Sequence, residues 1–246
     1  MVMINYIKAE IYRVFSRRYL YMMNFICLGF MIFIIIMSLS VGNINESNIT
    51  DAFKASFLIP ISFVAILGFS VIYTDDLNAK TLPTAIGFGI KEYAIVITKL
   101  VITMINVVLF SVIAFIVLVV ICFLIGIGLN ITLVSDVFIV MIEHILYITI
   151  YSSIAAIVVY GFQKASPAST IFFLLVCRIV DYAIKFVLSM QFFIDNVGDF
   201  SSYTIMDVIE NVMTKANFMT ISQYILYLFV AIQISIFVFK KKGLEF

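Results

Sequence analysis

The sequence predicts an all-α, polytopic membrane protein with six transmembrane helices. Of its 246 residues, 64% are hydrophobic and 12% are charged, whereas soluble domains are about half apolar and about a quarter charged. The apolar residues gather in runs of the ~20 residues that a helix needs to cross a bilayer. These runs lack the alternation that is typical of transmembrane β-strands. Lipid is therefore the predicted solvent of most of the chain.

The whole chain, 1–246, is predicted to form one transmembrane domain. Its six predicted spans are 20–41, 55–74, 100–125, 137–161, 168–190 and 222–239. Segment 3–19 precedes them, and its apolar residues recur at helical spacing, which predicts an amphipathic helix in the membrane interface. The alternative is a cytoplasmic extension of the first span. The three cysteines, Cys27, Cys122 and Cys177, are scattered through the spans and form neither a disulfide framework nor a metal-ligand pattern.

Lysine and arginine are distributed unequally between the two sides of the predicted spans. One side has only Lys54 and Lys215. The other collects Lys8, Arg13, Arg17, Arg18, Lys80, Lys91, Lys99, Lys164, Lys240, Lys241 and Lys242. The positive-inside rule therefore places both termini and the loop 75–91 in the cytoplasm. Segment 191–221 is then extracellular or re-entrant, and apolar residues at helical spacing predict a helix over 205–213 that Ser201 or Thr204 begins.

The cytoplasmic loop 75–91 carries signals for a short helix. Thr81 is an N-cap type and Pro83 fits a first helical turn, while Gly87 and Gly89 can end the helix. We therefore expect a helix over 82–86, with a plain polar loop as the alternative. The helical pattern resumes at Ile90 and continues to residue 125, which exceeds the bilayer thickness. The third helix is thus expected to project into the cytoplasm or to bend near Lys99.

This loop resembles the first intracellular loop of type-2 ABC exporter permeases. That loop carries an acidic residue, Gly-Thr five residues later, a short coupling helix, a basic residue, and a lysine that opens the third span. Asp76, Thr81 and Lys99 match this pattern, Lys91 stands where arginine is usual, and Lys80 stands where glycine is expected. The amphipathic start, the six spans, the long outer segment and the basic end "FKKKGLEF" extend the resemblance over nearly the whole chain.

The resemblance implies a transport subunit rather than an enzyme, with no cofactor of its own. The sequence contains no G-x-x-x-x-G-K-[ST] motif, so the ATP is expected to be bound by a soluble ABC ATPase dimer. The implied contacts for this partner are the N-terminal helix and the coupling residues Asp76, Thr81, Leu82, Pro83, Ile86 and Lys91. A second permease subunit is also implied, whereas the net charge of +1 gives no reason to expect nucleic acid.

The resemblance extends to the class of cargo and to the location. Small permeases of this build look like those of the cell membrane of Gram-positive bacteria that expel lantibiotics or other amphipathic antimicrobial peptides. Peptide export or self-immunity is therefore expected, and a lipid-like substrate remains an alternative.

Ionisable side chains lie inside the predicted fourth and fifth spans, and they are Glu143, His144, Arg178, Asp181 and Lys185. A charge near the bilayer centre costs about 2.5–3.5 kcal/mol on insertion scales, so these groups should face protein or water. Similar depths along the two spans allow a Glu143–Lys185 pair, and the spacing allows Asp181 to pair with Arg178. The network either holds two helices together or lines the substrate path.

Two other classes of function fit the sequence less well. A secondary transporter or channel is disfavoured because the two halves show no repeat and no matching helix breaks. An intramembrane enzyme is disfavoured further. The chain has one histidine, which makes a zinc site implausible, and "GFSV" at 68–71 lacks the closing glycine of the rhomboid-type serine motif.

Overall fold

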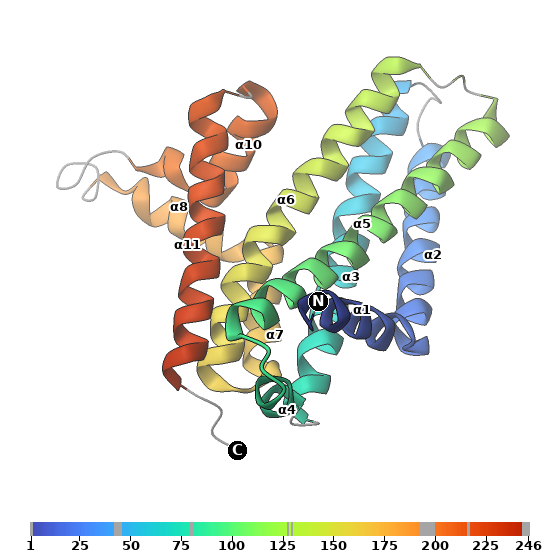
Figure 1. Cartoon of the computed structure of the whole chain (residues 1–246). Helices are drawn as coiled ribbons and strands as arrows, with labels where there is room; N and C mark the ends of the chain where they lie inside the picture. Colours follow the sequence, from blue (N-terminus) through green and yellow to red (C-terminus); the bar gives the residue numbers. More distant parts are fainter. Residues whose placement is uncertain are drawn as a thin grey trace. The chain divides into compact units, whose positions relative to one another are not determined.

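The structure, a computed structural model, describes residues 2–41, 46–78, 81–126, 128, 130–191, 200–215 and 217–242. These residues form helices joined by turns, and no strand occurs among them. The long helices are α2 (Arg18–Val41), α3 (Glu46–Asn78), α5 (Glu92–Ile125), α6 (Ile131–Phe162) and α11 (Phe218–Lys242). The short ones are α1 (Val2–Phe15), α4 (Thr81–Gly87), α7 (Ala165–Val176), α8 (Ile179–Leu188), the 3-10 turn η1 (Ser201–Tyr203) and α10 (Ile205–Lys215) (Figure 1).

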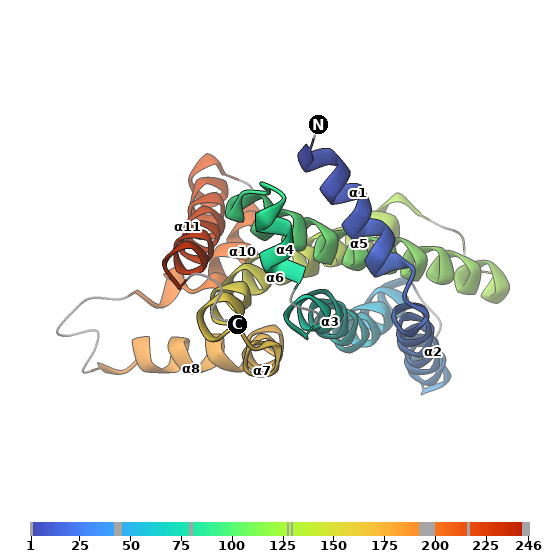
Figure 2. The ribbon, with the colours of Figure 1, turned by 60° about the horizontal axis from the view of Figure 1, so that its bottom comes forward.

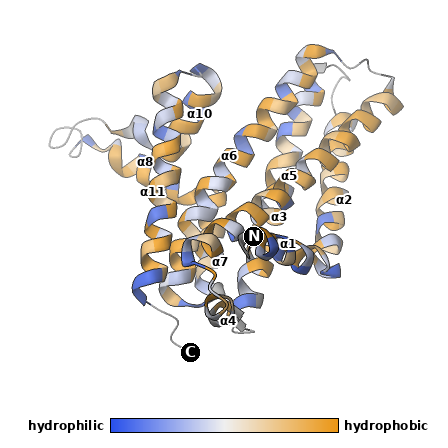
Figure 3. Cartoon of the chain, viewed as in Figure 1, coloured by the Kyte–Doolittle hydropathy of each residue, from blue (hydrophilic) through white to orange (hydrophobic). Residues whose placement is uncertain are grey.

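Within the described residues, five helices are long and apolar enough to cross a membrane. They cover Arg18–Ser40, Asn48–Thr74, Glu92–Ile125, Ile131–Phe162 and Phe218–Lys242, and Figure 3 shows them as hydrophobic along most of their length. Large apolar side chains such as Phe25 and Phe33 point outward, with 71% and 59% of their surface exposed. Such exposure suits a lipid solvent. The chain is a polytopic helical membrane protein, as the sequence predicts.

The predicted span over 168–190 is not continuous in the structure. α7 ends at Val176 and α8 begins at Ile179, and Arg178 between them adopts the left-handed conformation with φ of 60°. α7 has 12 residues and α8 has 10, so they measure about 18 and 15 Å. Neither is long enough for a hydrocarbon core of about 30 Å. Among the described residues, five long helices and one divided segment thus stand where the sequence predicts six spans.

The described chain divides into two compact units. The first contains residues 1–72 and 101–145, and the second contains residues 73–100 and 146–246. The borders between them fall inside α3, α5 and α6. The first unit thus holds α1, α2, most of α3 and α5, and the first part of α6. The second holds the ends of α3 and α5 that flank α4, the latter part of α6, and everything that follows.

In the first unit, α1 is a separate helix and not an extension of the first long helix. The backbone leaves the helical path at Ser16 and Arg17, and α2 begins at Arg18. Figure 2 shows α1 running away from the start of α2 at an angle. Val14 on α1 is buried with 2% exposure, whereas Ile4 is 60% exposed. One face of α1 thus packs on the unit while its start remains open.

In the second unit, α10 and α11 form a helical hairpin. α10 covers the helix predicted over 205–213 and runs back beside the first turns of α11 (Figure 1). Asp207 N donates to Thr204 Oγ1 at 3.3 Å, so Thr204 caps the helix start, as predicted. Val208 and Ile209 on α10 are buried. Their burial holds α10 against the unit, and the segment 192–199 before it lies outside the described residues.

Candidate functional site

The first candidate site is the loop that carries α4, and local backbone chemistry accounts for its shape. α4 covers the predicted short helix. It ends where Gly89 takes a φ of 81° and its N–H donates to Ile86 O at 2.8 Å. Such a left-handed turn is what glycine favours after a helix. Lys80, which stands where the permease motif has glycine, lies outside the described residues.

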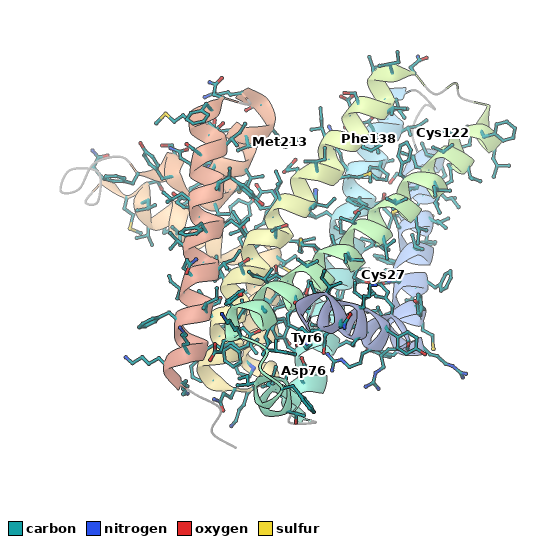
Figure 4. All side chains as sticks on the ribbon, viewed as in Figure 1. Tyr6, Cys27, Asp76, Cys122, Phe138 and Met213 are labelled. Carbon is teal, nitrogen blue, oxygen red and sulfur yellow. The ribbon has the colours of Figure 1, made fainter. Side chains whose placement is uncertain are left out.

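A buried ion pair closes this loop at its base. Asp76 near the end of α3 pairs with Lys99 in the first turns of α5, and the two residues are 2% and 1% exposed. Figure 4 labels Asp76 at the junction between α3 and α4. The motif matched these residues separately, and the structure brings them together. We call this ion pair, together with α4 and the residues 88–91 that follow it, the loop platform.

The exposure of the loop platform separates anchoring residues from accessible ones. Leu82 is buried with 4% exposure, so its side chain packs α4 against the chain. Ile86 is half-buried and Lys91 is exposed, while the side chains of Thr81 and Pro83 lie outside the described residues. Phe88 is 78% exposed. Sequence analysis missed Phe88, although a phenylalanine between two glycines is a recognisable signal.

The second candidate site is a set of polar side chains on α6, α8 and α10 in the second unit. Arg178 lies over the ring of Tyr147, with 4.1 Å between its guanidinium carbon and the ring centroid. Tyr151 donates its hydroxyl to Asp181 Oδ2. Asp181 is therefore hydrogen-bonded to a tyrosine, and the predicted partner Arg178 stacks on another. We call these four residues the tyrosine cluster.

Lys185 pairs with Asp207 within the second unit, whereas Glu143 belongs to the first unit. Lys185 Nζ lies 2.6 Å from Asp207 Oδ1 on α10. Thr204 donates its hydroxyl to the other oxygen of Asp207 at 2.5 Å. The Glu143–Lys185 pair that the sequence allows assumed one straight helix over 168–190, and the turn at Arg178 redirects the residues that follow it.

Glu143 and His144 belong to the first unit, unlike the other three predicted network residues. His144 is 9% exposed, and its Nδ1 lies 2.8 Å from Val140 O. Its ring packs edge-on against Phe57, with 5.6 Å between the ring centroids. Among the described residues, no group of three or more His, Cys, Asp or Glu side chains is placed to hold a metal ion. His144 thus lies in an aromatic core.

Asn106 in the first unit is a polar core residue that sequence analysis missed. Its Oδ1 accepts from Asn24 Nδ2 at 3.2 Å, and its Nδ2 donates to Val64 O at 3.4 Å. A Cβ at Gly68 would lie 2.7 Å from that Nδ2. Gly68, in the "GFSV" segment, therefore makes room for an amide that links α2, α3 and α5. This packing role accounts for the glycine without any catalytic serine motif.

A pocket of about 460 Å³ lies beside the tyrosine cluster, within the second unit. Its walls come from α6, α8, the η1–α10 segment and α11. The lining residues are Ile150, Ile154, Ile157, Asp181, Ile184, Tyr203, Thr204, Ile205, Leu226, Tyr227, Val230, Ala231 and Ile234. Apolar walls with a few convergent polar groups are typical of small-molecule sites.

No model of a known protein family matches this sequence, and no curated protein matches it. The function is therefore inferred from the loop platform and the pocket.

Proposed function

We propose that this chain is the membrane-spanning permease subunit of an ATP-binding-cassette exporter. Its cargo is a hydrophobic or amphipathic molecule, an antimicrobial peptide such as a lantibiotic, which it expels across the cell membrane in export or self-immunity. A soluble ATPase dimer supplies the energy, and a second permease subunit completes the path. The observation that carries the proposal is the loop platform, a short helix on two long helices whose ends a buried ion pair joins.

The loop platform has the properties that a soluble partner needs in order to move two membrane helices. Phe88 and Thr84 are exposed and available for contact. Leu82 anchors α4, and the Asp76–Lys99 pair ties α3 to α5 beneath it. Separating a buried pair leaves charges without compensation, which costs several kcal/mol. A push on α4 therefore passes into α3 and α5 together instead of deforming the loop.

The arrangement of charge around the second unit supports a cytoplasmic position for α4. α4 lies toward the end of α11 that carries Lys240–Lys242, whereas α10 lies beside the opposite end (Figure 1). Lys91 next to α4 is also exposed. Cations gather on the cytoplasmic side of membrane proteins. In the proposed complex, α1 lies in the inner membrane interface, both chain ends are cytoplasmic, and the ATPase meets α4 from the cytoplasm.

Co-purification with the ATPase encoded in a neighbouring reading frame tests the proposal. Phe88→Asp places a charge at the exposed tip and is expected to reduce the co-purified ATPase at least tenfold, with membrane insertion unchanged. Phe218→Asp is the matched control, because Phe218 is 89% exposed at the start of α11 and lies outside the loop platform. Normal ATPase recovery with Phe88→Asp, or cargo transport by the purified subunit alone, would contradict the proposal.

A further inference from the structure

The pocket of the second unit has a buried floor and an apolar rim. Asp181, Thr204, Ile150 and Ala231 are between 0% and 6% exposed and form the floor. The rim residues Ile184, Tyr203, Leu226, Val230 and Ile234 are between 43% and 56% exposed. A molecule that enters from the rim thus meets apolar side chains first and polar groups last.

Asp181 places a carboxyl group at the floor of this pocket. Among the described lining residues, it is the only one with a charged side chain. Its Oδ2 accepts the hydroxyl of Tyr151, whereas its Oδ1 accepts no hydrogen bond from another described residue. Neither of the nearby cations on its own segment lines the pocket, since Arg178 stacks on Tyr147 and Lys185 pairs with Asp207. One carboxylate oxygen therefore remains available to a ligand.

We propose that this pocket binds an amphiphile with one apolar chain and a primary ammonium head. The chain packs between α11 and the isoleucines of α6, and the ammonium donates a hydrogen bond to Asp181 Oδ1. Hydrogen bonds between two charged groups are stronger than neutral ones. A volume of about 460 Å³ suits a single drug-sized ligand. The inference deepens the proposed function, on which it rests for the role of the ligand as cargo, by naming the chemistry of the part of the cargo that this pocket holds.

The proposed site requires a ligand with both a positive charge and an N–H donor, and this predicts a ranking among simple probes. Dodecylammonium supplies a positive charge and N–H donors. Dodecyltrimethylammonium supplies the charge without a donor, and dodecanol supplies a donor without the charge. Only the first satisfies a buried carboxylate, because such a group favours a hydrogen bond from a cation. Dodecylammonium is therefore expected to bind at least tenfold more tightly than the other two.

A tryptophan at the rim provides a local reporter, because the chain contains no tryptophan. Tyr203→Trp exchanges one exposed aromatic ring for another on η1 and retains the backbone carbonyl that accepts from Tyr227 at 2.9 Å. The full chain is placed in phosphatidylcholine nanodiscs without any ATPase, and versions of the three probes with brominated chains are titrated in. Saturable quenching of the tryptophan reports occupancy of the pocket. Phe237→Trp on α11, outside the lining residues, is the control for simple partitioning into lipid.

Substitutions of residues on the pocket floor test whether Asp181 binds the ammonium group. Asp181→Asn is expected to bring the three affinities within about twofold, while Asp181→Glu retains the preference for the ammonium. Ala231→Met keeps the carboxylate but fills the floor, so it is expected to weaken all three probes and covers the case in which Asp181→Asn does not fold. Equal quenching by the three probes, or a preference that Asp181→Asn leaves unchanged, overturns the proposal.

A last arm separates cargo from membrane lipid, since phosphatidylethanolamine also carries a primary ammonium. Adding it to the nanodiscs is expected to leave the affinity for dodecylammonium unchanged, because the pocket has room for one chain. Loss of probe binding would show that lipid occupies the site and would overturn the assignment to cargo. The nanodiscs contain no ATPase, so a negative binding result does not affect the co-purification test of the loop platform. A negative co-purification result, in turn, does not affect the binding test of the pocket.

Discussion

Asp76 and Lys99 form an ion pair in which both residues are almost wholly buried, at 2% and 1% exposure. They stand at opposite ends of the loop that carries α4, so the pair joins the end of α3 to the start of α5. A buried pair adds little net stability over an apolar substitute, but removing one partner is severe. The Asp76–Lys99 pair therefore fixes where α3 and α5 meet.

Single substitutions in this pair are expected to destabilise the protein much more than the double substitution. Lys99→Met and Asp76→Asn should each lower the free energy of unfolding by about 3–5 kcal/mol, because each removes only one of the two opposite charges that compensate each other in the buried pair. The combination Asp76→Asn/Lys99→Met should recover most of this loss. Unfolding in mixed detergent micelles, read by circular dichroism, measures all three variants. Additive losses in the double variant would show that the two residues do not interact.

Features set by neighbouring residues were predictable from the sequence, and features set by distant contacts were not. Apolar runs gave the long helices, and Gly89 with Thr204 marked helix ends, because these signals act over a few residues. No glycine or proline next to Arg178 signals the turn in the sequence. The side chain of Arg178 lies over Tyr147, which is on another helix. The pairing of Lys185 with Asp207 on α10 likewise joins segments that are distant in the sequence.

Gly68 is expected to be intolerant of alanine, in contrast to most helical glycines. The added Cβ would lie 2.7 Å from Asn106 Nδ2, so the amide must move and its hydrogen bonds to Asn24 and Val64 weaken. Each such bond contributes about 1 kcal/mol, and a loss of about 1–2 kcal/mol in unfolding free energy is expected.

Gly29 on α2 is the matched control for this substitution. No atom lies within 4 Å of a Cβ built there, so Gly29→Ala should be neutral or stabilise by up to about 1 kcal/mol through helix propensity. In an Asn106→Ala background the obstacle is absent, and Gly68→Ala should then behave like Gly29→Ala. A full penalty for Gly68→Ala in that background would mean that another contact limits the site.

Arg178 is expected to tolerate glycine better than alanine. Both variants lose the stacking on Tyr147, but alanine must still adopt the left-handed backbone at φ of 60°, which costs about 1–2 kcal/mol. After allowing for the greater freedom of glycine in the unfolded chain, Arg178→Gly should be the more stable by about 1 kcal/mol. At Thr170 within α7, the opposite order of stability is expected: Thr170→Ala should be more stable than Thr170→Gly, because glycine weakens a regular helix by about 1 kcal/mol relative to alanine. The same order at both positions would rule out backbone strain at Arg178.

The membrane side of α4 decides whether a cytoplasmic ATPase can reach it. After replacement of Cys27, Cys122 and Cys177 by alanine, the exposed positions Phe88 and Lys215 accept single cysteines. An impermeant maleimide added to intact cells should label Lys215→Cys on α10 but label Phe88→Cys only after the membrane is opened, because the lysine and arginine distribution places α4 inside. Labelling in opened membranes controls for expression and for access to each thiol. Labelling of Phe88→Cys from outside intact cells would exclude the proposed docking, since no cytoplasmic partner could then touch α4.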